Sequence, residues 1–391
     1  MNRMKLCSFV AVFAVLALQA QSAPVVSPEV HADGSVTFRY EDPAAKSVAV
    51  YLENQATTMP MHKGSDGVWT GDTQPLTPEY YGYLMVVDGR RVMDSRDPDV
   101  RPNLRASSSV VHVTGAMPMP WDLTDIPHGE THHVLYESKL AHDDRDLYVY
   151  TPPGYDPNRK QPYPVLYLLH GYTDGAVGWL EVGKANLMMD SMLAQGKVQP
   201  MVVVMPRAYG TMQMMGPEGG YLPQRYGVAI DSQRKFTDQM LQEVLPLAEA
   251  RYNIAHDAAH RALAGLSMGG GHSIATGVSH PEVFGYVGAF SPAIVAPSIT
   301  RVGAKPGELA DAAYAAGFAE LVPHAATQPA LRLLWTSCGT EDSLISEDRA
   351  FAAWAKANVK GNVMTRETPG AHFWVLWRDD LVAVAPLLFT K

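Results

Sequence analysis

The chain has almost no cysteine, no cluster of basic residues and, after its first residues, no long apolar run. Two cysteines among 391 residues exclude a scaffold built on disulfide bonds. The 31 Lys and Arg residues are outnumbered by 40 Asp and Glu residues, so no nucleic-acid partner is expected. No later stretch reaches the roughly 20 apolar residues of a membrane helix. Apolar residues make up 47% of the chain, which suits a folded protein of two domains.

The first residues have the pattern of an export signal. Two basic residues precede an apolar run over residues 6–18, and small residues follow at positions 20, 22 and 23. This pattern predicts a secretory signal peptide over residues 1–22, with a buried N-terminal helix as the alternative. We therefore expect a secreted or periplasmic protein that has no membrane contact after signal cleavage. Its one remaining thiol, Cys338, cannot form an internal disulfide.

Two regions with different patterns of apolar and polar residues follow. Over residues 24–115, apolar and polar residues alternate at 36–40, 48–52 and 81–87, and Asp88-Gly89 predicts a turn. This pattern predicts a small β-sandwich. Residues 116–127 are rich in proline and predict a linker.

From residue 128 onward the apolar runs are continuous, at 165–169 and 201–205 and, with interruptions, at 262–264 and 331–335. Such runs indicate strands that are covered on both faces, as in a mostly parallel sheet. Phe236, Met240, Val244 and Leu247 share one face of a helix between them. Residues 128–391 are therefore predicted to form a three-layer α/β domain.

A G-x-S-x-G pattern over Gly265–Gly269 directly follows one of these strands. A serine at a tight turn between a strand and a helix exposes its hydroxyl, so Ser267 is the predicted nucleophile. The alternative is a glycine-rich phosphate loop, but the spacing and the lysine of that motif are absent.

A serine nucleophile needs a histidine base and a carboxylate that orients it, and in α/β-hydrolases these follow the serine in the order acid, then histidine. The strand that ends near Cys338 leads into Glu341 and Asp342, and either carboxylate could serve. His372 is the only histidine after His324 and is the natural base. A helix cap for Asp342 and a structural turn for His372 are the alternatives.

The developing oxyanion needs backbone N–H donors, which we expect from Met268 and from Tyr172 in the loop after residues 165–169. His170 precedes the serine and is expected to organise that loop. Met214 and Trp374 are candidate substrate contacts, with loop packing and core packing as the respective alternatives. No cofactor is implied. No metal is expected either, because the histidines at 128, 132 and 133 lack a completing carboxylate set.

Residues 128–391 resemble carbohydrate esterase family 1, which contains feruloyl and acetyl-xylan esterases of the α/β-hydrolase fold. The resemblance rests on five ordered motifs at Tyr150–Tyr155, Tyr167–Gly171, Gly265–Gly270, Cys338–Asp342 and Gly370–Trp374. It implies Ser267 as nucleophile, Asp342 rather than Glu341 as the acid, and His372 as the base. The two glycines usual before that histidine are replaced here by Gly370-Ala371.

Residues 24–115 resemble the immunoglobulin-like module of family 48 carbohydrate-binding modules, on Gly67–Gly71 and Tyr83–Gly89. Together the two resemblances imply a serine esterase acting on feruloylated or acetylated xylan or oligosaccharides, with feruloyl esterase activity on arabinoxylan expected first. Acetyl-xylan deacetylation, siderophore trilactone hydrolysis, acyl transfer between glycolipids and an inactive carbohydrate-binding protein are the alternatives. The sequence leaves the oligomeric state open.

Overall fold

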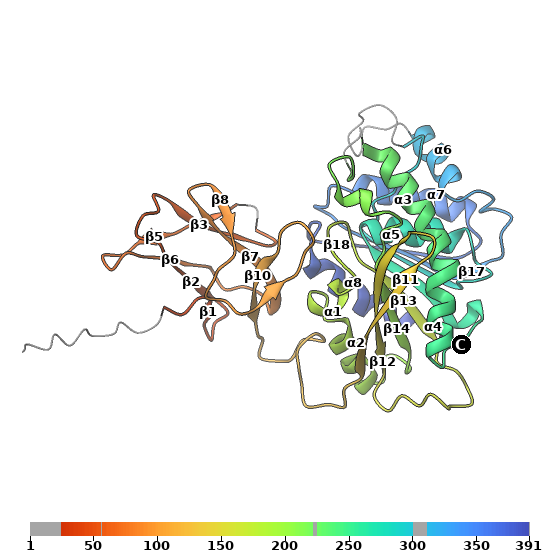
Figure 1. Cartoon of the computed structure of the whole chain (residues 1–391), viewed down its shortest axis with the longest axis horizontal. Coiled ribbons are helices and arrows are strands. Elements are labelled where there is room, and N and C mark those ends of the chain that lie inside the picture. The colour runs from red at the N-terminus through yellow and green to blue at the C-terminus, as the bar shows by residue number, and fades with distance from the viewer. Residues whose placement is uncertain (1–24, 56, 222–224, 300–310, 391) are drawn as a thin grey trace, which may run out of the picture.

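The computed structural model describes residues 25–55, 57–221, 225–299 and 311–390, so the predicted signal peptide over residues 1–22 lies outside the described residues. The described chain forms two parts that lie next to each other along the long axis of the molecule (Figure 1). An all-β part comes first, and a larger part with a central sheet and helices follows.

The first part contains two antiparallel sheets. One sheet has the order β1 (Glu29–Val30), β2 (Val36–Glu41), β6 (Val68–Asp72) and β5 (His62–Lys63). The other has the order β4 (Met59–Pro60), β3 (Val48–Leu52), β7 (Glu79–Val87), β10 (Ser108–Val113) and β9 (Val100–Arg101), with β8 (Arg90–Val92) paired to β7.

The two sheets share one core, so this part is a β-sandwich, as predicted. Phe38 from β2 and Tyr83 from β7 meet there with ring centroids 4.7 Å apart, and both side chains are buried. The apolar residues of the predicted alternation in β2, β3 and β7 line this core because alternate side chains of a strand point to the same face. The predicted turn at Asp88-Gly89 is present, with φ of 46° and 82°.

The second part is built on one eight-stranded sheet of order β11 (Glu130–Ser138), β12 (Asp143–Thr151), β14 (Val202–Pro206), β13 (Val165–Leu169), β15 (Arg261–Leu266), β16 (Tyr286–Phe290), β17 (Leu331–Gly339) and β18 (Gly361–Thr368). β11, β12 and β14 pair antiparallel, and all later pairs are parallel. The carboxyl ends of the parallel strands therefore meet at one edge of the sheet.

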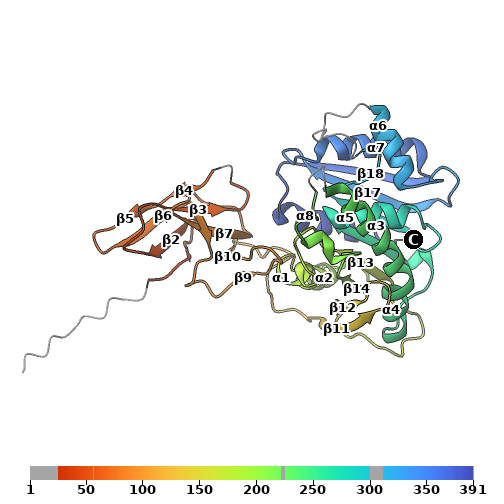
Figure 2. The same cartoon turned by 45° about the horizontal axis from the view of Figure 1, so that its top comes forward.

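Helices cover both faces of this sheet (Figure 2). Leu166 and Leu168 of β13 pack with α1 (Gly178–Glu181), α2 (Ala185–Ala194) and α8 (Trp374–Val384). Tyr167 and Leu169 pack on the other face with α3 (Tyr226–Gln239), η3 (Met240–Val244) and α4 (Leu245–Arg251). The predicted three-layer α/β architecture is confirmed. The remaining helical elements are η1 (Met212–Met215), η4 (Ala258–His260), α5 (Met268–Ser273), η5 (Ile274–Val278), α6 (Asp311–Leu321), α7 (Ile345–Asn358) and η6 (Ala385–Leu387).

The helix face predicted from Phe236 to Leu247 is interrupted by one π-helical turn, η3. Phe236, Met240 and Val244 are buried, but beyond the turn Ala248 is buried and Leu247 is only partly so. A π turn adds a residue to the repeat and rotates the following face, which a constant 3.6-residue period cannot anticipate. Within the described ranges, no helix combines the length and the apolarity that crossing a bilayer requires.

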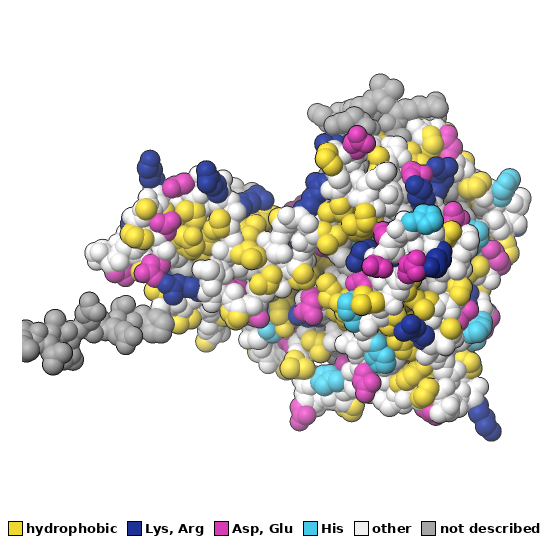
Figure 3. All heavy atoms as spheres, in the orientation of Figure 1, with side chains coloured by type: hydrophobic (Ala, Val, Ile, Leu, Met, Phe, Trp, Pro, Cys, Tyr) yellow, Lys and Arg dark blue, Asp and Glu magenta, His cyan; other side chains and the backbone are white. Residues whose placement is uncertain are grey.

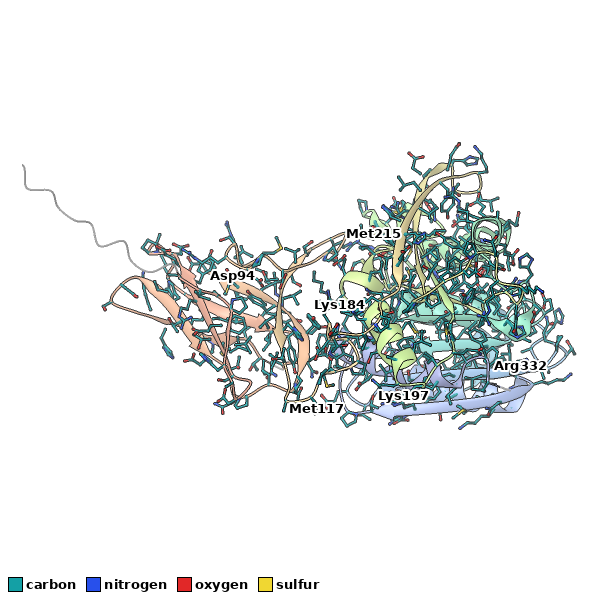
Figure 4. The ribbon with its side chains drawn as sticks, turned by 90° about the horizontal axis from the view of Figure 1, so that it is seen from below. Asp94, Met117, Lys184, Lys197, Met215 and Arg332 are labelled. Carbon is teal, nitrogen blue, oxygen red and sulfur yellow. The ribbon has the colours of Figure 1, made fainter. Side chains whose placement is uncertain are left out.

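The segment predicted as a linker, residues 116–127, contains no helix or strand but is not a free tether. Its Trp121 is buried in the core under α8, where Arg378 lies over the indole ring at 5.9 Å. Arg378 also reaches the β-sandwich, because its guanidinium lies 2.9 Å from Glu79 and donates to the carbonyl of Tyr80. Lys184, which Figure 4 labels at the boundary of the two parts, lies over the Tyr80 ring at 5.2 Å. The segment and the boundary therefore form one packed contact.

The surface agrees with the charge balance of the sequence. On the face in Figure 3, acidic and basic side chains are interspersed and no broad field of Lys and Arg is present. A basic field is the electrostatic footprint of a nucleic-acid binder, so this face offers no such surface.

Candidate active site

Ser267 alone joins β15 to α5, at the carboxyl edge of the parallel strands. Its φ of 51° and ψ of −114° are values that a residue with a side chain rarely adopts. The Ser267 N–H donates to the carbonyl of Phe290 at 2.8 Å, and the Ala293 N–H donates to the carbonyl of Ser267 at 2.9 Å. These bonds hold the strained turn and leave the hydroxyl presented beyond the end of the strand, the geometry of a nucleophile elbow.

The glycines on either side of Ser267 are required by close backbone contacts. A Cβ on Gly265 would lie 2.7 Å from the carbonyl oxygen of Gly269. A Cβ on Gly269 would lie 2.6 Å from the carbonyl oxygen of Leu169, at the end of β13. Both distances are shorter than any ordinary carbon–oxygen contact, so the spacing of the motif follows from steric crowding at the elbow.

Asp342 and His372 come from the loops after β17 and β18 and meet Ser267 at the same edge. His372 Nε2 lies 2.9 Å from Ser267 Oγ, and His372 Nδ1 lies 2.7 Å from Asp342 Oδ2. The structure thus brings together three side chains that are 105 and 30 residues apart in sequence. The other oxygen of Asp342 accepts from the N–H of Leu344 at 2.9 Å.

The charge state of Asp342 favours proton transfer from Ser267 to His372. Burial of Asp342 opposes its ionisation, but the hydrogen bonds from His372 and from the Leu344 N–H outweigh burial and keep the pKa of this carboxyl below its usual value. Asp342 is therefore an acceptor at neutral pH. It fixes the proton of His372 on Nδ1 and leaves Nε2 free to accept from Ser267. The His372 side chain is 33% exposed and can reach solvent or substrate.

The loop after β13, which holds Tyr172, passes beside the nucleophile. A Cβ on Gly171 would lie 3.5 Å from the Cβ of Ser267. Met268 is the first residue of α5, where a helix leaves its N–H groups without intrahelical partners. The Tyr172 hydroxyl donates to the carbonyl of Met214 at 3.1 Å. The loop of Tyr172 and the start of α5 thus both lie beside Ser267, and the N–H groups of Tyr172 and Met268 stay the predicted oxyanion donors.

His170 holds this loop together. Its Nε2 accepts from the Ala208 N–H at 2.9 Å, so the ring proton is on Nδ1, which lies 2.8 Å from the carbonyl of Gly171. Burial lowers the pKa of His170 to about 4, so the ring is neutral at physiological pH. This geometry agrees with the expectation that His170 organises the loop.

The side chains of the two predicted substrate contacts are buried in the described structure, and their contact with a substrate stays a prediction. Trp374 is 0% exposed and packs against Trp179 with ring centroids 5.0 Å apart, and Met214 is 1% exposed in the core under α3. Both side chains fill the interior because bulky apolar residues close to a catalytic loop also serve the adjacent core. The histidines at 128, 132 and 133 contact Asp190, Tyr252 and Asp146 respectively, and among the described residues no group of three or more His, Cys, Asp or Glu could hold a metal ion.

Sequence reasoning missed the residues that hold Thr173, next to Tyr172. Its N–H donates to the hydroxyl of Tyr209 at 2.7 Å, and its hydroxyl accepts from the side-chain amide of Asn103 at 2.9 Å. Asn103 belongs to the β-sandwich and lies 70 residues away in sequence. No motif marks such a contact, so no signal in a single sequence could have found it.

Known proteins that resemble this chain include esterases. Residues 138–388 match the "Putative esterase" family, which is well over half of the chain. The chain belongs to this family. Its larger part has the α/β-hydrolase fold.

This esterase is 28% identical to the endo-1,4-beta-xylanase/feruloyl esterase of Xylanibacter ruminicola over 370 residues, which cover 93% of the chain and 46% of that relative. A match to endo-1,4-beta-xylanase Y of Acetivibrio thermocellus is 30% identical and covers 32% of the chain and 11% of that protein. The chain therefore spans less than half the length of these curated relatives.

Two solved structures share the fold. A ferulic acid esterase from Anaeromyces mucronatus superposes with a TM-score of 0.56 at 24% identity, over 70% of this chain and 96% of that one. The enterobactin esterase of Shigella flexneri superposes with a TM-score of 0.66 at 20% identity, over 91% of this chain and 93% of that one. A match over 91% of the chain must include the β-sandwich. The Shigella flexneri structure therefore shares the fold of both parts.

Proposed function

We propose that this esterase hydrolyses hydroxycinnamoyl esters, such as feruloyl groups on plant arabinoxylan, through an acyl-enzyme on Ser267. The observation that carries the proposal is the hydrogen-bonded chain from Ser267 through His372 to Asp342, at 2.9 and 2.7 Å. The feruloyl esterase activity in the name of the Xylanibacter relative, which matches 93% of the chain, supports the choice of substrate. The predicted signal peptide adds export to the proposal, and the β-sandwich adds a carbohydrate-binding role.

In this mechanism His372 Nε2 takes the proton of Ser267 as Oγ attacks the ester carbonyl, and the carbonyl oxygen becomes an oxyanion. The N–H groups of Met268 and Tyr172 hold that oxyanion. His372 then gives its proton to the leaving sugar alkoxide, and an acyl group remains on Ser267. A water molecule repeats the sequence and releases the acid. Asp342 orients His372 and stabilises its charged form throughout.

A second candidate is hydrolysis of a catecholate siderophore ester. It is favoured by the superposition of the Shigella flexneri enterobactin esterase over 91% of this chain, β-sandwich included. Acetyl-xylan deacetylation is a third candidate that uses the same triad. The three differ only in the acyl group and the alcohol, so relative rates decide among them.

The test compares kcat/KM on methyl ferulate, acetylated xylan and enterobactin, with Ser267→Ala as the control. We expect methyl ferulate to be cleaved most efficiently, and Ser267→Ala to lower kcat by on the order of 10⁴ to 10⁶ and to abolish labelling by a fluorophosphonate. Preference for acetylated xylan or enterobactin would overturn the hydroxycinnamoyl assignment but retain the nucleophile. An active, labelled Ser267→Ala variant would overturn the triad itself. Product analysis with a sugar acceptor separates hydrolysis from acyl transfer.

A further inference from the structure

A loop of the β-sandwich, residues 102–107, lies directly against the loop that holds Tyr172. The Leu104 N–H donates to the carbonyl of Thr173 at 2.8 Å. The Asn103 side-chain amide donates to Thr173 Oγ1 at 2.9 Å and to Asp174 Oδ1 at 3.2 Å. Arg105 lies over the Tyr172 ring at 5.2 Å. We call residues 102–107 the bracing loop.

The bracing loop holds a residue whose backbone is strained. Thr173 has a φ of +76°, a left-handed value that β-branched residues rarely adopt. All its polar groups are bonded: the N–H to Tyr209, the carbonyl to Leu104 and the hydroxyl to Asn103. Two of these three bonds come from the β-sandwich. A strained residue persists only where its surroundings over-determine it, so the sandwich supplies most of what holds Thr173.

Relaxation of Thr173 would move the candidate oxyanion donor. The carbonyl of Gly171 is held by the His170 ring at 2.8 Å and by the Asp174 N–H at 3.3 Å, and Asp174 is buried beside Asn103. Tyr172 and Thr173 span these two fixed points, so a change in the φ of Thr173 must be absorbed by Tyr172. The N–H of Tyr172 would then turn away from the position that the oxyanion occupies.

The sandwich also contacts the loop of the catalytic histidine. Glu53 accepts from the N–H of Trp374 at 3.1 Å, two residues after His372. The other oxygen of Glu53 accepts from Arg101 at 3.0 Å, just before the bracing loop. The buried carboxylate of Glu53 thus connects the bracing loop to the loop of His372. The β-sandwich therefore contacts both the loop of Tyr172 and the loop of His372.

We propose that Asn103 is a positioning residue for catalysis, which acts through Thr173 to hold the N–H of Tyr172 toward the oxyanion. The inference rests on the proposed function, because it needs Ser267 as the nucleophile. The competing interpretation is that Asn103 merely joins the two parts of the molecule. The two interpretations differ in what they predict for transition-state binding.

Three variants of the full chain separate these interpretations. Asn103→Asp keeps the side-chain oxygen that accepts from Arg105 N–H at 3.0 Å and Ala106 N–H at 3.2 Å. It replaces the amide donor by a carboxylate oxygen, which faces Thr173 and the buried Asp174. Asn103→Ala loses both the oxygen and the amide donor. Asp42→Ala is the matched control, because Asp42 accepts from Ala44 N–H and Ala45 N–H in an equivalent exposed turn of the sandwich.

We measure kcat and KM for 4-nitrophenyl acetate and the inhibition constant of an alkyl trifluoromethyl ketone, whose adduct with serine places an oxyanion in the hole. Both Asn103 variants should lose about 10-fold or more in kcat, less than the roughly 10² to 10³ lost when a donor is deleted. KM should stay within about 2-fold, and the inhibition constant should rise by the same factor as kcat falls. Asp42→Ala should match the wild type.

Wild-type kcat and inhibition constant in Asn103→Asp, with or without a lowered melting temperature, would overturn the proposal. If that variant does not fold, Thr173→Val removes the same hydrogen bond from the hydrolase side and leaves the sandwich unchanged. A Thr173→Val variant with full kcat would overturn the proposal equally. A wild-type chain that neither hydrolyses esters nor takes the fluorophosphonate label would refute the proposed function instead, so the two failures are distinguishable.

Discussion

Three carboxyl groups near the start of α7 lie within seven residues of each other in sequence. Their pKa values are shifted in opposite directions. The pKa of Asp342 is held low by its bonds to His372 and to backbone N–H. Burial raises the pKa of Glu347 to about 8 and that of Asp348 to about 6. Environments that separate the pKa values of neighbouring acids let one site hold carboxyl groups in different protonation states. At neutral pH Asp342, which contacts His372, is ionised, whereas Glu347 is mostly protonated.

Glu347→Gln should remove a pH-dependent loss of stability. The Glu347 side chain accepts from the Ile294 N–H at 2.9 Å, and glutamine keeps an oxygen for that bond. Because the folded-state pKa is raised from 4.5 to about 8, the stabilising contribution of Glu347 is fully present below pH 4.5 and is lost as the pH rises toward 8. Relative to the wild type, the variant should gain free energy of unfolding by at most about 1.4 kcal/mol per pH unit in this window.

Urea unfolding at several pH values between 5 and 8.5 measures this difference. Glu137→Gln is the control, because Glu137 is exposed and its pKa is lowered by the hydrogen bond from Lys139. Its contribution is present at high pH and lost only on acidification, so this variant should gain nothing as the pH rises. A constant difference between Glu347→Gln and the wild type across the range would contradict the assignment of a raised pKa.

At the scale of helices and strands, the elbow between β15 and α5 leaves no room for added atoms. Gly269→Ala should lower both kcat and the free energy of unfolding, because the new Cβ would contact the carbonyl oxygens of Leu169 and His170 at 2.6 and 2.7 Å. We expect a loss of stability of about 1–3 kcal/mol or more, the usual cost of overpacking. Gly227→Ala, in α3, is the control. Its Cβ would meet nothing within 4 Å, and alanine should raise stability by about 0.5–1 kcal/mol. Equal effects of the two substitutions in thermal unfolding would contradict this account.

At this scale the sequence was informative wherever a pattern is local. The alternation in β2 and β7, the apolar run of β13 and the G-x-S-x-G turn each depend on residues a few positions apart, and the elements lie where those patterns predict. The π turn at Met240–Val244 and the strained Thr173 depend on packing with distant segments, which no periodicity records. The atoms of Ser267, His372 and Asp342 meet as their order predicted, while their catalytic roles stay a prediction until activity is measured.

The boundary between the two parts contributes to the stability of the whole molecule. Arg378 is 1% exposed, lies 2.9 Å from the buried Glu79, and donates to the carbonyls of Val182 and Tyr80. Arg378→Ala should lower the free energy of unfolding by about 3–5 kcal/mol, because a buried carboxyl and two carbonyls lose their partner. Arg39→Ala is the control, because the Arg39–Glu29 pair is partly exposed at the surface and should contribute about 0–1 kcal/mol. Denaturant titration of both variants checks this, and a loss no larger than that of the control would contradict it.

The hydrogen bond from Asn103 to Thr173 also limits which domains could replace the β-sandwich. A sugar-binding appendage on a flexible tether can be exchanged between enzymes without loss of turnover, since it alters only where the catalyst resides. Here the β-sandwich contacts the loops that hold Tyr172 and His372. A replacement domain from another protein would therefore need residues equivalent to 102–107 and to Glu53. We therefore expect exchange of the β-sandwich for an unrelated domain to lower turnover.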